Sequence, residues 1–230
     1  MKHEVVHGPS FALLKVRLEA GESITAEAGA MVTRQGRVAM KTRLNAGTRA
    51  GIFGRLIAFF IALFRKVIGG ETMFINEFTA EAQGEVSFAP PLAGQIAHRR
   101  LDNERIMLTT GSFLACGPGI DMRMRWGGLR GILSKEGLVF LELSGTGDLF
   151  MTAYGGIQAV PVDGRFVVDN GHMVAFDAGL DFRITSAGGG VMGLVASGEG
   201  LVCELTGRGT VYIQSRNVGA LVGWLARLLP

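Results

Sequence analysis

Short runs of alternating or β-branched residues recur along this chain, with glycines between them. Such runs cover residues 139–143, 149–152, 166–168 and 210–213. Alternation with a period of two sends successive side chains to opposite faces of a strand, and glycines between the runs are typical of hairpin turns. The pattern predicts an all-β fold.

The runs belong to a unit that occurs three times. Each copy starts with a turn glycine and an apolar strand, at Gly29, Gly111 and Gly171, and later has a Glu-Gly or Gly-Glu pair before a second apolar strand. A repeat constrains the architecture more strongly than any single element. We therefore predict one compact β-domain over residues 1–230, built of three similar units at about 1–95, 96–160 and 161–215.

Two glycine pairs inside the repeats resemble phosphate-binding loops, namely Gly145-Thr146-Gly147 and Gly207-Arg208-Gly209. A phosphate loop needs a helix N-terminus directly after it to receive the anion. The residues after both pairs continue as strand, so we expect these glycines to serve backbone geometry.

The first unit is longer than the other two, and the excess falls on residues 51–68, the most hydrophobic stretch of the chain. Its unbroken apolar run at 56–64 is shorter than the roughly 20 residues of a membrane-spanning helix. We expect a short inserted apolar helix. One interpretation buries it between the subunits of a homo-oligomer. The other places it at a membrane surface, with Arg55, Arg65 and Lys66 facing anionic headgroups.

A second helix is predicted at the C-terminus, over residues 216–229, where large apolar residues form a single helical stripe. Trp224 lies beside this stripe, and we expect it to pack on the β-body, or alternatively on a partner subunit. The candidate residues for an oligomer or membrane interface are Phe53, Leu56, Phe59, Phe60, Phe64 and Trp224.

Composition narrows the functional classes. The chain has 48% hydrophobic and 19% charged residues, which excludes disorder caused by charge repulsion. A net charge of +3 is a small excess, and the basic stretch at 98–100 lacks interleaved aromatic residues, so nucleic acid is not the expected partner. The N-terminal residues lack the features of an export signal. We expect a cytoplasmic protein, alternatively one bound peripherally to the inner face of the membrane.

Metal and thiol chemistry receive little support. Two cysteines without a Cys-x-x-Cys spacing predict neither a disulfide nor a zinc site. Residues 3–7 match His-Glu-x-x-His, but Val5 and Val6 favour a strand, and Gly8-Pro9 would end any helix. His98 and His172 have no partner in the sequence. We therefore predict no metal site and no cofactor.

The most suggestive polar cluster lies at 168–177, where His172 stands between two carboxylates. A tight turn explains it, with Asp169 and Asn170 binding turn amides. Alternatively, His172 and Asp177 belong to an enzyme active site. We predict no catalytic residues and keep this alternative for the structure to address.

Six segments, spread over most of the chain, resemble the altered-inheritance-of-mitochondria protein (number 24) family, whose bacterial members have no known biochemical function. The segments are 27–32, 69–74, 111–115 together with 119–120, 168–177, 198–202 and 214–217. The resemblance implies a fold similar to the tryptophan RNA-binding attenuation protein: a β-sandwich or double-stranded β-helix of tandem units in one chain, assembling into homo-oligomers. Mitochondrial relatives resemble inner-membrane organisation factors, which fits a scaffold.

These observations together predict a non-enzymatic, oligomeric scaffold or interaction protein, with a membrane surface as a further candidate partner. The alternatives are an RNA- or small-ligand-binding module, in which a face of the β-sandwich binds, and an enzyme that uses His172.

Overall fold

A computed structural model describes residues 1–44, 74–126, 139–186 and 201–228. Within this part of the chain the fold is mostly β, as predicted, and the strands form one large antiparallel sheet of 13 strands. The strands are β1 (Lys2–Val6), β2 (Leu13–Leu18), β3 (Ser23–Glu27), β4 (Met31–Leu44), β5 (Phe74–Phe88), β6 (Ile96–Thr109), β7 (Phe113–Cys116), β8 (Ile120–Trp126), β9 (Val139–Thr152), β10 (Ile157–Asp169), β11 (Met173–Asp177), β12 (Asp181–Ser186) and β13 (Leu201–Gln214). Two 3₁₀ turns, η1 (Thr110–Ser112) and η3 (Asn170–His172), precede β7 and β11.

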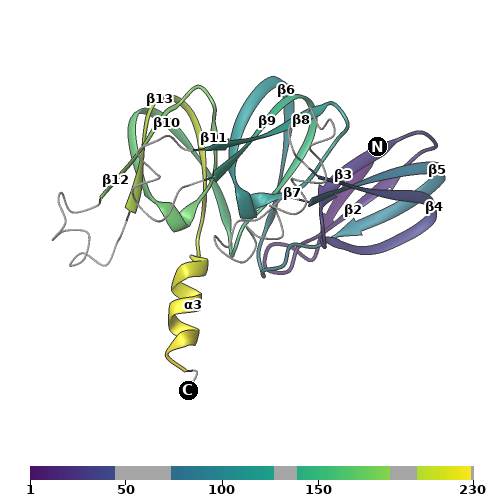
Figure 1. The fold of residues 1–230 in the computed structure, drawn as a ribbon, viewed down its shortest axis with the longest axis horizontal. Helices are drawn as coiled ribbons and strands as arrows, with labels where there is room; N and C mark the ends of the chain where they lie inside the picture. The colour runs from purple at the N-terminus through teal and green to yellow at the C-terminus, as the bar shows by residue number, and fades with distance from the viewer. Residues whose placement is uncertain (45–73, 127–138, 187–200, 229–230) are drawn as a thin grey trace, which may run out of the picture.

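Three long strands organise the sheet. β5 pairs with β2, β3 and β4; β9 pairs with β6, β7 and β8; and β13 pairs with β10, β11 and β12. Figure 1 shows the resulting first, second and third strand groups lying in a row. Two short pairings join neighbouring groups, β3 with β7 and β6 with β11. β1 extends the first group through β2.

Alternation along the strands explains the core. In β2, for example, Leu14, Val16 and Leu18 are fully buried, while the residues between them are more exposed. Three clusters of buried side chains result, and they follow the three strand groups closely. Some side chains cross between groups: Ile96, Leu114, Ala115 and Phe150 lie on strands of the second group but pack in the cluster of the first. Phe150 is the largest of the four. This aromatic side chain ties the two groups together.

The glycine pairs have the structural role that was predicted. β9 and β13 run without interruption through Gly145 and Gly207, which adopt φ values of +128° and +118°. A Cβ atom on Gly145 would lie only 2.2 Å from the carbonyl oxygen of Gly119. Glycine is therefore required at this bend by both conformation and space, and no helix follows that could bind a phosphate.

The C-terminal helix is present as α3 (Val218–Ala226), shorter at both ends than predicted. It begins after Asn217, whose side-chain oxygen accepts a hydrogen bond of 3.2 Å from the Ala220 amide. A side chain that caps the first turn in this way fixes the start of a helix. Residues 51–68, where an inserted helix is predicted, lie outside the described residues. Within the described chain, the helices are too short or too polar to cross a bilayer.

Candidate functional site

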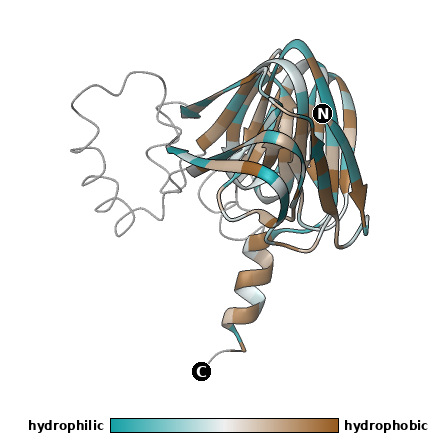
Figure 2. Ribbon diagram, turned by 90° about the vertical axis from the view of Figure 1, so that its right-hand side faces the viewer, coloured by the Kyte–Doolittle hydropathy of each residue, from teal (hydrophilic) through white to brown (hydrophobic). Residues whose placement is uncertain are grey.

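The C-terminal helix exposes a large apolar surface. α3 projects from the end of β13, away from the sheet (Figure 1), and most of its length is hydrophobic (Figure 2). None of its nine residues has a charged side chain. Large apolar side chains stay 39% to 63% exposed on α3 and just after it: Val218, Val222, Trp224, Leu225 and Leu228.

Trp224 is the one predicted interface residue within the described chain. The expectation that it packs on the β-body is wrong, because its side chain is 58% exposed. The reason is the direction of α3, which leaves the sheet instead of folding back over it. The other five candidates, Phe53, Leu56, Phe59, Phe60 and Phe64, lie outside the described residues.

A hollow of about 520 Å³ lies at the base of α3 and includes His172 and Trp224 in its lining. His172 is held there through Nδ1, which lies 2.8 Å from the carbonyl oxygen of Gln214. Asp177 has partners elsewhere: Arg99 Nη1 at 2.5 Å and the Thr210 amide at 2.8 Å. The two members of the proposed enzyme pair therefore belong to separate hydrogen-bond networks.

The segment before β11 is the tight turn that was predicted. The Asp169 carboxylate accepts a hydrogen bond of 2.8 Å from the Gly171 amide, across the η3 turn. The Asn170 amide differs from expectation, because its oxygen faces Cys203 Sγ at 3.7 Å.

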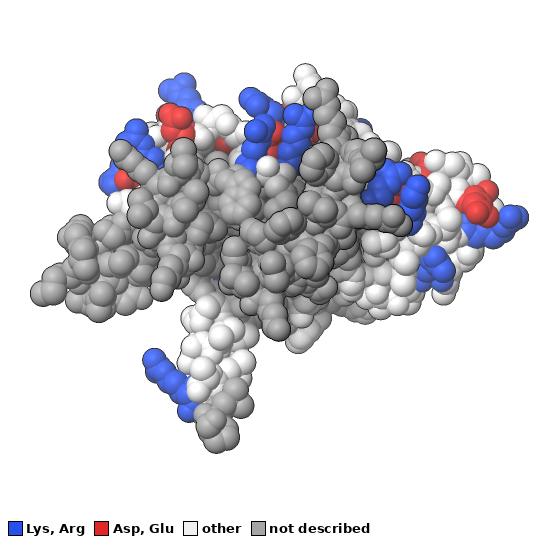
Figure 3. All heavy atoms as spheres, viewed as in Figure 1, with Lys and Arg blue, Asp and Glu red and all other residues white. Residues whose placement is uncertain are grey.

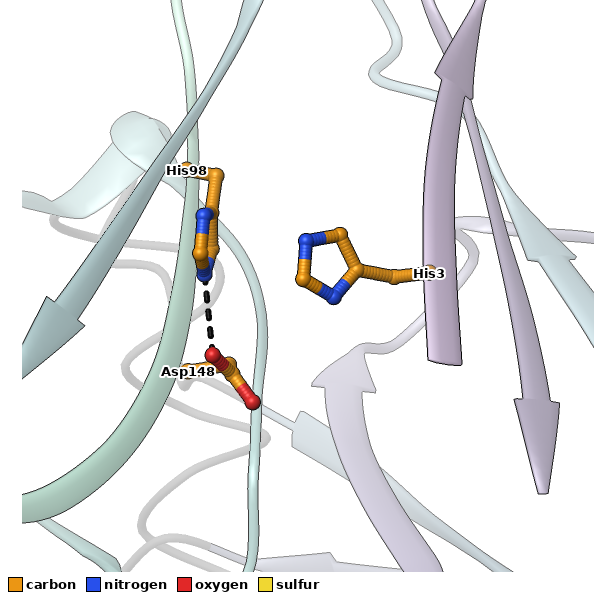
Figure 4. Close-up of side chains that lie close together, drawn as sticks. All are labelled: His3, His98 and Asp148. Carbon is orange, nitrogen blue, oxygen red and sulfur yellow. Dashed lines mark hydrogen bonds and ion pairs between the residues drawn. The ribbon is translucent and has the colours of Figure 1, made fainter. Parts of the chain in front are cut away.

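A second cluster brings together His3 of β1, His98 of β6 and Asp148 of β9 (Figure 4). His98 Nε2 lies 2.9 Å from Asp148 Oδ1, and the ring centroids of His3 and His98 are 4.4 Å apart. One ligand atom from each of the three side chains lies within 4.8 Å of the others. The expectation that His98 has no partner is therefore wrong.

Strand pairing places His98 and Asp148 beside the buried ring of Phe150. In the β6–β9 register, His98 lies opposite Phe150 and Arg100 lies opposite Asp148, so all four side chains share one face of the sheet. The Phe150 ring is fully buried and lies 5.1 Å from the ring of His98 and 4.9 Å from that of His3. Arg100 Nη1 donates to Asp148 Oδ2 at 3.1 Å.

The protonation of the cluster follows from these contacts. Partial burial lowers the pKa of His3 below its ordinary value, and the neighbouring His98 lowers it further. Burial alone would raise the pKa of Asp148, but the hydrogen bond from His98 and the charge of Arg100 outweigh it and hold this pKa below its usual value. At neutral pH the cluster therefore contains a neutral His3 imidazole and an ionised carboxylate.

Sequence reasoning missed this cluster for a definable reason. His98 and Asp148 are 50 positions apart, and only the register of β6 against β9 brings them together. That register could have been sought by aligning the two runs as a hairpin. The approach of His3 could not, because β1 pairs with β2 and reaches His98 through side-chain packing alone.

Basic side chains on the sheet are mixed with acidic ones (Figure 3). Several arginines pair with a glutamate on the adjacent strand. These pairs are Arg17 with Glu85, Arg37 with Glu81, Arg43 with Glu77, Arg125 with Glu142, and Arg165 with Glu204. Such pairing neutralises charge that a phosphate backbone would otherwise attract.

Comparisons with known proteins find relatives over almost the whole chain. A family model described as "Mitochondrial biogenesis AIM24" matches residues 3–216. The uncharacterized protein M6_Spy0233 of Streptococcus pyogenes serotype M6 is 31% identical over 233 residues, covering 100% of this chain and 92% of the relative. The crystal structure of protein SPYM3_0169 from Streptococcus pyogenes matches with a TM-score of 0.80 at 30% identity, covering 99% of both chains. Both the sequence and the fold thus match proteins of Streptococcus pyogenes over nearly the whole chain.

Proposed function

The chain belongs to the mitochondrial biogenesis AIM24 family, and from this premise we propose that it is a non-enzymatic scaffold whose copies assemble into a homo-oligomer through α3. The observation that carries the proposal is the exposed apolar surface of this helix. A helix that is apolar on most of its circumference is stable in water only when other surfaces cover it.

Several features favour a second copy of the chain as the cover. A helix that lies flat on a membrane has a charged face toward water, and α3 has no charged residue. Nine residues at about 1.5 Å each also fall well short of the roughly 30 Å of a bilayer core. Helices from neighbouring copies would cover one another without either requirement.

Gly219 and Gly223 support the same conclusion. They are four residues apart and so lie on one side of α3, next to the exposed Val222. Glycine inside a helix is less favourable than alanine by about 1 kcal/mol. A Cβ atom on Gly223 would meet nothing within 4 Å, so the chain itself gives no reason for glycine there. Close approach of another helix would supply one.

The alternatives are less well supported by the described residues. The Arg-Glu pairs across strands disfavour an RNA-binding face. An enzyme that uses His172 and Asp177 would need them in one site, whereas each is held by partners of its own. Small-ligand binding at the hollow beside α3 would compete directly with assembly.

The scaffold proposal includes a finer description of the body as three tandem units that form a β-sandwich or double-stranded β-helix. The long strands β5, β9 and β13 support it, because each pairs with three strands in the same manner. Copies joined through a terminal helix would leave these strand groups available to other proteins.

Sedimentation velocity of the full chain tests the assembly. We expect an oligomer for the wild type and a monomer for the double variant Val222→Glu/Leu225→Glu, because both side chains are exposed on α3 and charge would prevent their burial. Phe11→Glu is the matched control, since Phe11 is 74% exposed on the body, and it should leave the oligomer intact. A monomeric wild type, or a double variant of unchanged mass, contradicts the proposal.

Vesicle flotation tests whether lipid, instead of a second copy of the chain, covers α3. The same proteins are mixed with anionic and with neutral vesicles, and we expect none of them to float. If the wild type floats and the double variant does not, lipid covers α3 and assembly through this helix is wrong.

A further inference from the structure

The cluster of His3, His98 and Asp148 has the composition of a metal site. It offers two imidazole nitrogens and one carboxylate oxygen, a combination that suits Zn²⁺ and its neighbours among the first-row transition metals. The three side chains come from three different strands and converge on one point at the surface (Figure 4). Convergence from separate elements is unlike the scattered charge of an ordinary exposed face.

The distances are close to those of bound zinc. Tetrahedral ligands at 2.0–2.1 Å from the ion are roughly 3.3 Å from one another. His98 Nε2 and Asp148 Oδ1 are 2.9 Å apart, and the three candidate ligand atoms all lie within 4.8 Å of one another. His3 is exposed, and its ring can turn to close the remaining difference.

The surroundings hold the ligands in place. Phe150 stacks on the ring of His98 and restricts its orientation, while it meets the ring of His3 edge to face. Asp148 uses its two oxygens differently: Oδ1 faces the histidine, and Oδ2 accepts a hydrogen bond from Arg100. Ligating carboxylates are commonly held by such an outer partner.

We propose that His3, His98 and Asp148 bind one divalent transition metal ion of the zinc type, which fastens β1 to β6 and β9 and keeps a coordination position open to solvent. With three protein ligands, the fourth position of a tetrahedral ion is left for water or for a ligand from another molecule. The ion replaces the hydrogen bond between His98 and Asp148, and the positive charge of Arg100 reduces the attraction of the carboxylate for it. The site is independent of α3 and of assembly.

Titration of the full-length, chelator-treated protein with Co²⁺ and Zn²⁺ tests the site. We expect one equivalent of Co²⁺ to produce the visible absorption of a low-symmetry site, and Zn²⁺ to abolish it by displacement. His98→Ala and Asp148→Asn should each weaken binding at least tenfold. In calorimetry with Zn²⁺ the same variants should lose the same step, and Zn²⁺ should raise the Tm of the wild type but not of these two variants.

His7→Ala is the matched control, because His7 is an exposed histidine just beyond the end of β1. It should bind Co²⁺ like the wild type. Circular dichroism of each variant shows whether it is folded, and Asp148→Asn keeps the size of the side chain if His98→Ala does not fold. Binding that is equal in wild type, His98→Ala and Asp148→Asn, or lost in His7→Ala, would overturn the site. Sedimentation of the same samples separates this result from the assembly proposal.

Discussion

Two neighbouring residues of β6, His98 and Arg99, point to opposite sides of the strand and take part in two different junctions. His98 contacts His3, which lies on β1 of the first group, and bonds to Asp148 of its own group; these three residues are called here the histidine junction. Arg99 joins the second group to the third through Asp177 and Tyr212, the arginine junction.

The two junctions differ in how fully their polar groups are matched. Arg99 donates to Asp177, to Tyr212 and, at 2.7 Å, to Glu104. Burial works against its charge, but the hydrogen bonds to Glu104 and Asp177 outweigh this, and the pKa of Arg99 rises above its ordinary value. His3, in contrast, makes ring contacts with His98 and Phe150 but no hydrogen bond to a described side chain.

The difference separates a structural contact from a binding site. At the arginine junction the two carboxylates and the Tyr212 hydroxyl already accept hydrogen bonds from Arg99, and a ligand would have to displace one of these bonds. Imidazole rings that only stack keep nitrogen atoms for a further partner. Both junctions link adjacent strand groups, but only the histidine junction keeps imidazole nitrogen atoms for a further partner. The place of a contact in the fold therefore does not show whether it can bind a ligand.

The largest loss of stability is expected when Phe150, the aromatic ring beneath the histidine junction, is removed. Phe150 is fully buried and packs into the first core cluster. Phe150→Ala should lower the free energy of unfolding by about 3–5 kcal/mol, the range for a large aromatic side chain removed from a core. Urea unfolding followed by circular dichroism measures it. Phe11→Ala, at a 74% exposed position, should change stability by no more than about 0.5 kcal/mol.

The reactivity of the two buried cysteines reports which strand group the Phe150→Ala substitution destabilises. Cys116 lies opposite Leu149, the residue before Phe150 in β9, and Cys203 lies in the third group. Burial raises the pKa of each thiol to about 12, with Asp169 contributing at Cys203. Both should resist a thiol reagent at pH 8 in the native wild type. In Phe150→Ala we expect Cys116 to react faster than Cys203, and equal rates would mean that the groups open together.

A smaller loss of stability should follow from removing the Asp177 carboxylate from the arginine junction. Asp177→Ala leaves the half-buried Arg99 with one carboxylate and the Thr210 amide without its acceptor, so we expect a loss of about 2–3 kcal/mol. Asp177→Asn keeps an acceptor and should lose less. The control is Asp163→Ala, whose ion pair with Arg208 is largely exposed and should matter by less than about 0.5 kcal/mol. Equal losses at the two aspartates would mean that the arginine junction is as dispensable as a surface pair.

Most contacts of the two junctions could not be predicted from the sequence, because they form between strands that are far apart in the chain. Alternation and glycine spacing predicted the β-rich body, the strand through Gly145 and the turn at Asp169, because each depends on neighbours along the chain. The pair of Arg99 and Asp177 spans 78 positions and joins β6 to β11, two strands that are far apart in the chain. The direction of α3 was also missed, since an apolar stripe shows that a helix needs a partner without showing which one.

The smallest effect is expected at the metal-free histidine junction. His98→Ala removes one half-exposed hydrogen bond, and Arg100 stays on Asp148 to balance its charge, so the loss should be below about 1 kcal/mol. Urea unfolding in the presence of a chelator measures it beside Asp177→Ala. A loss as large as that of Asp177→Ala would make His98 a structural residue and the two junctions equivalent. A small loss means that β1 stays in place without this imidazole, leaving His98 available to bind an ion.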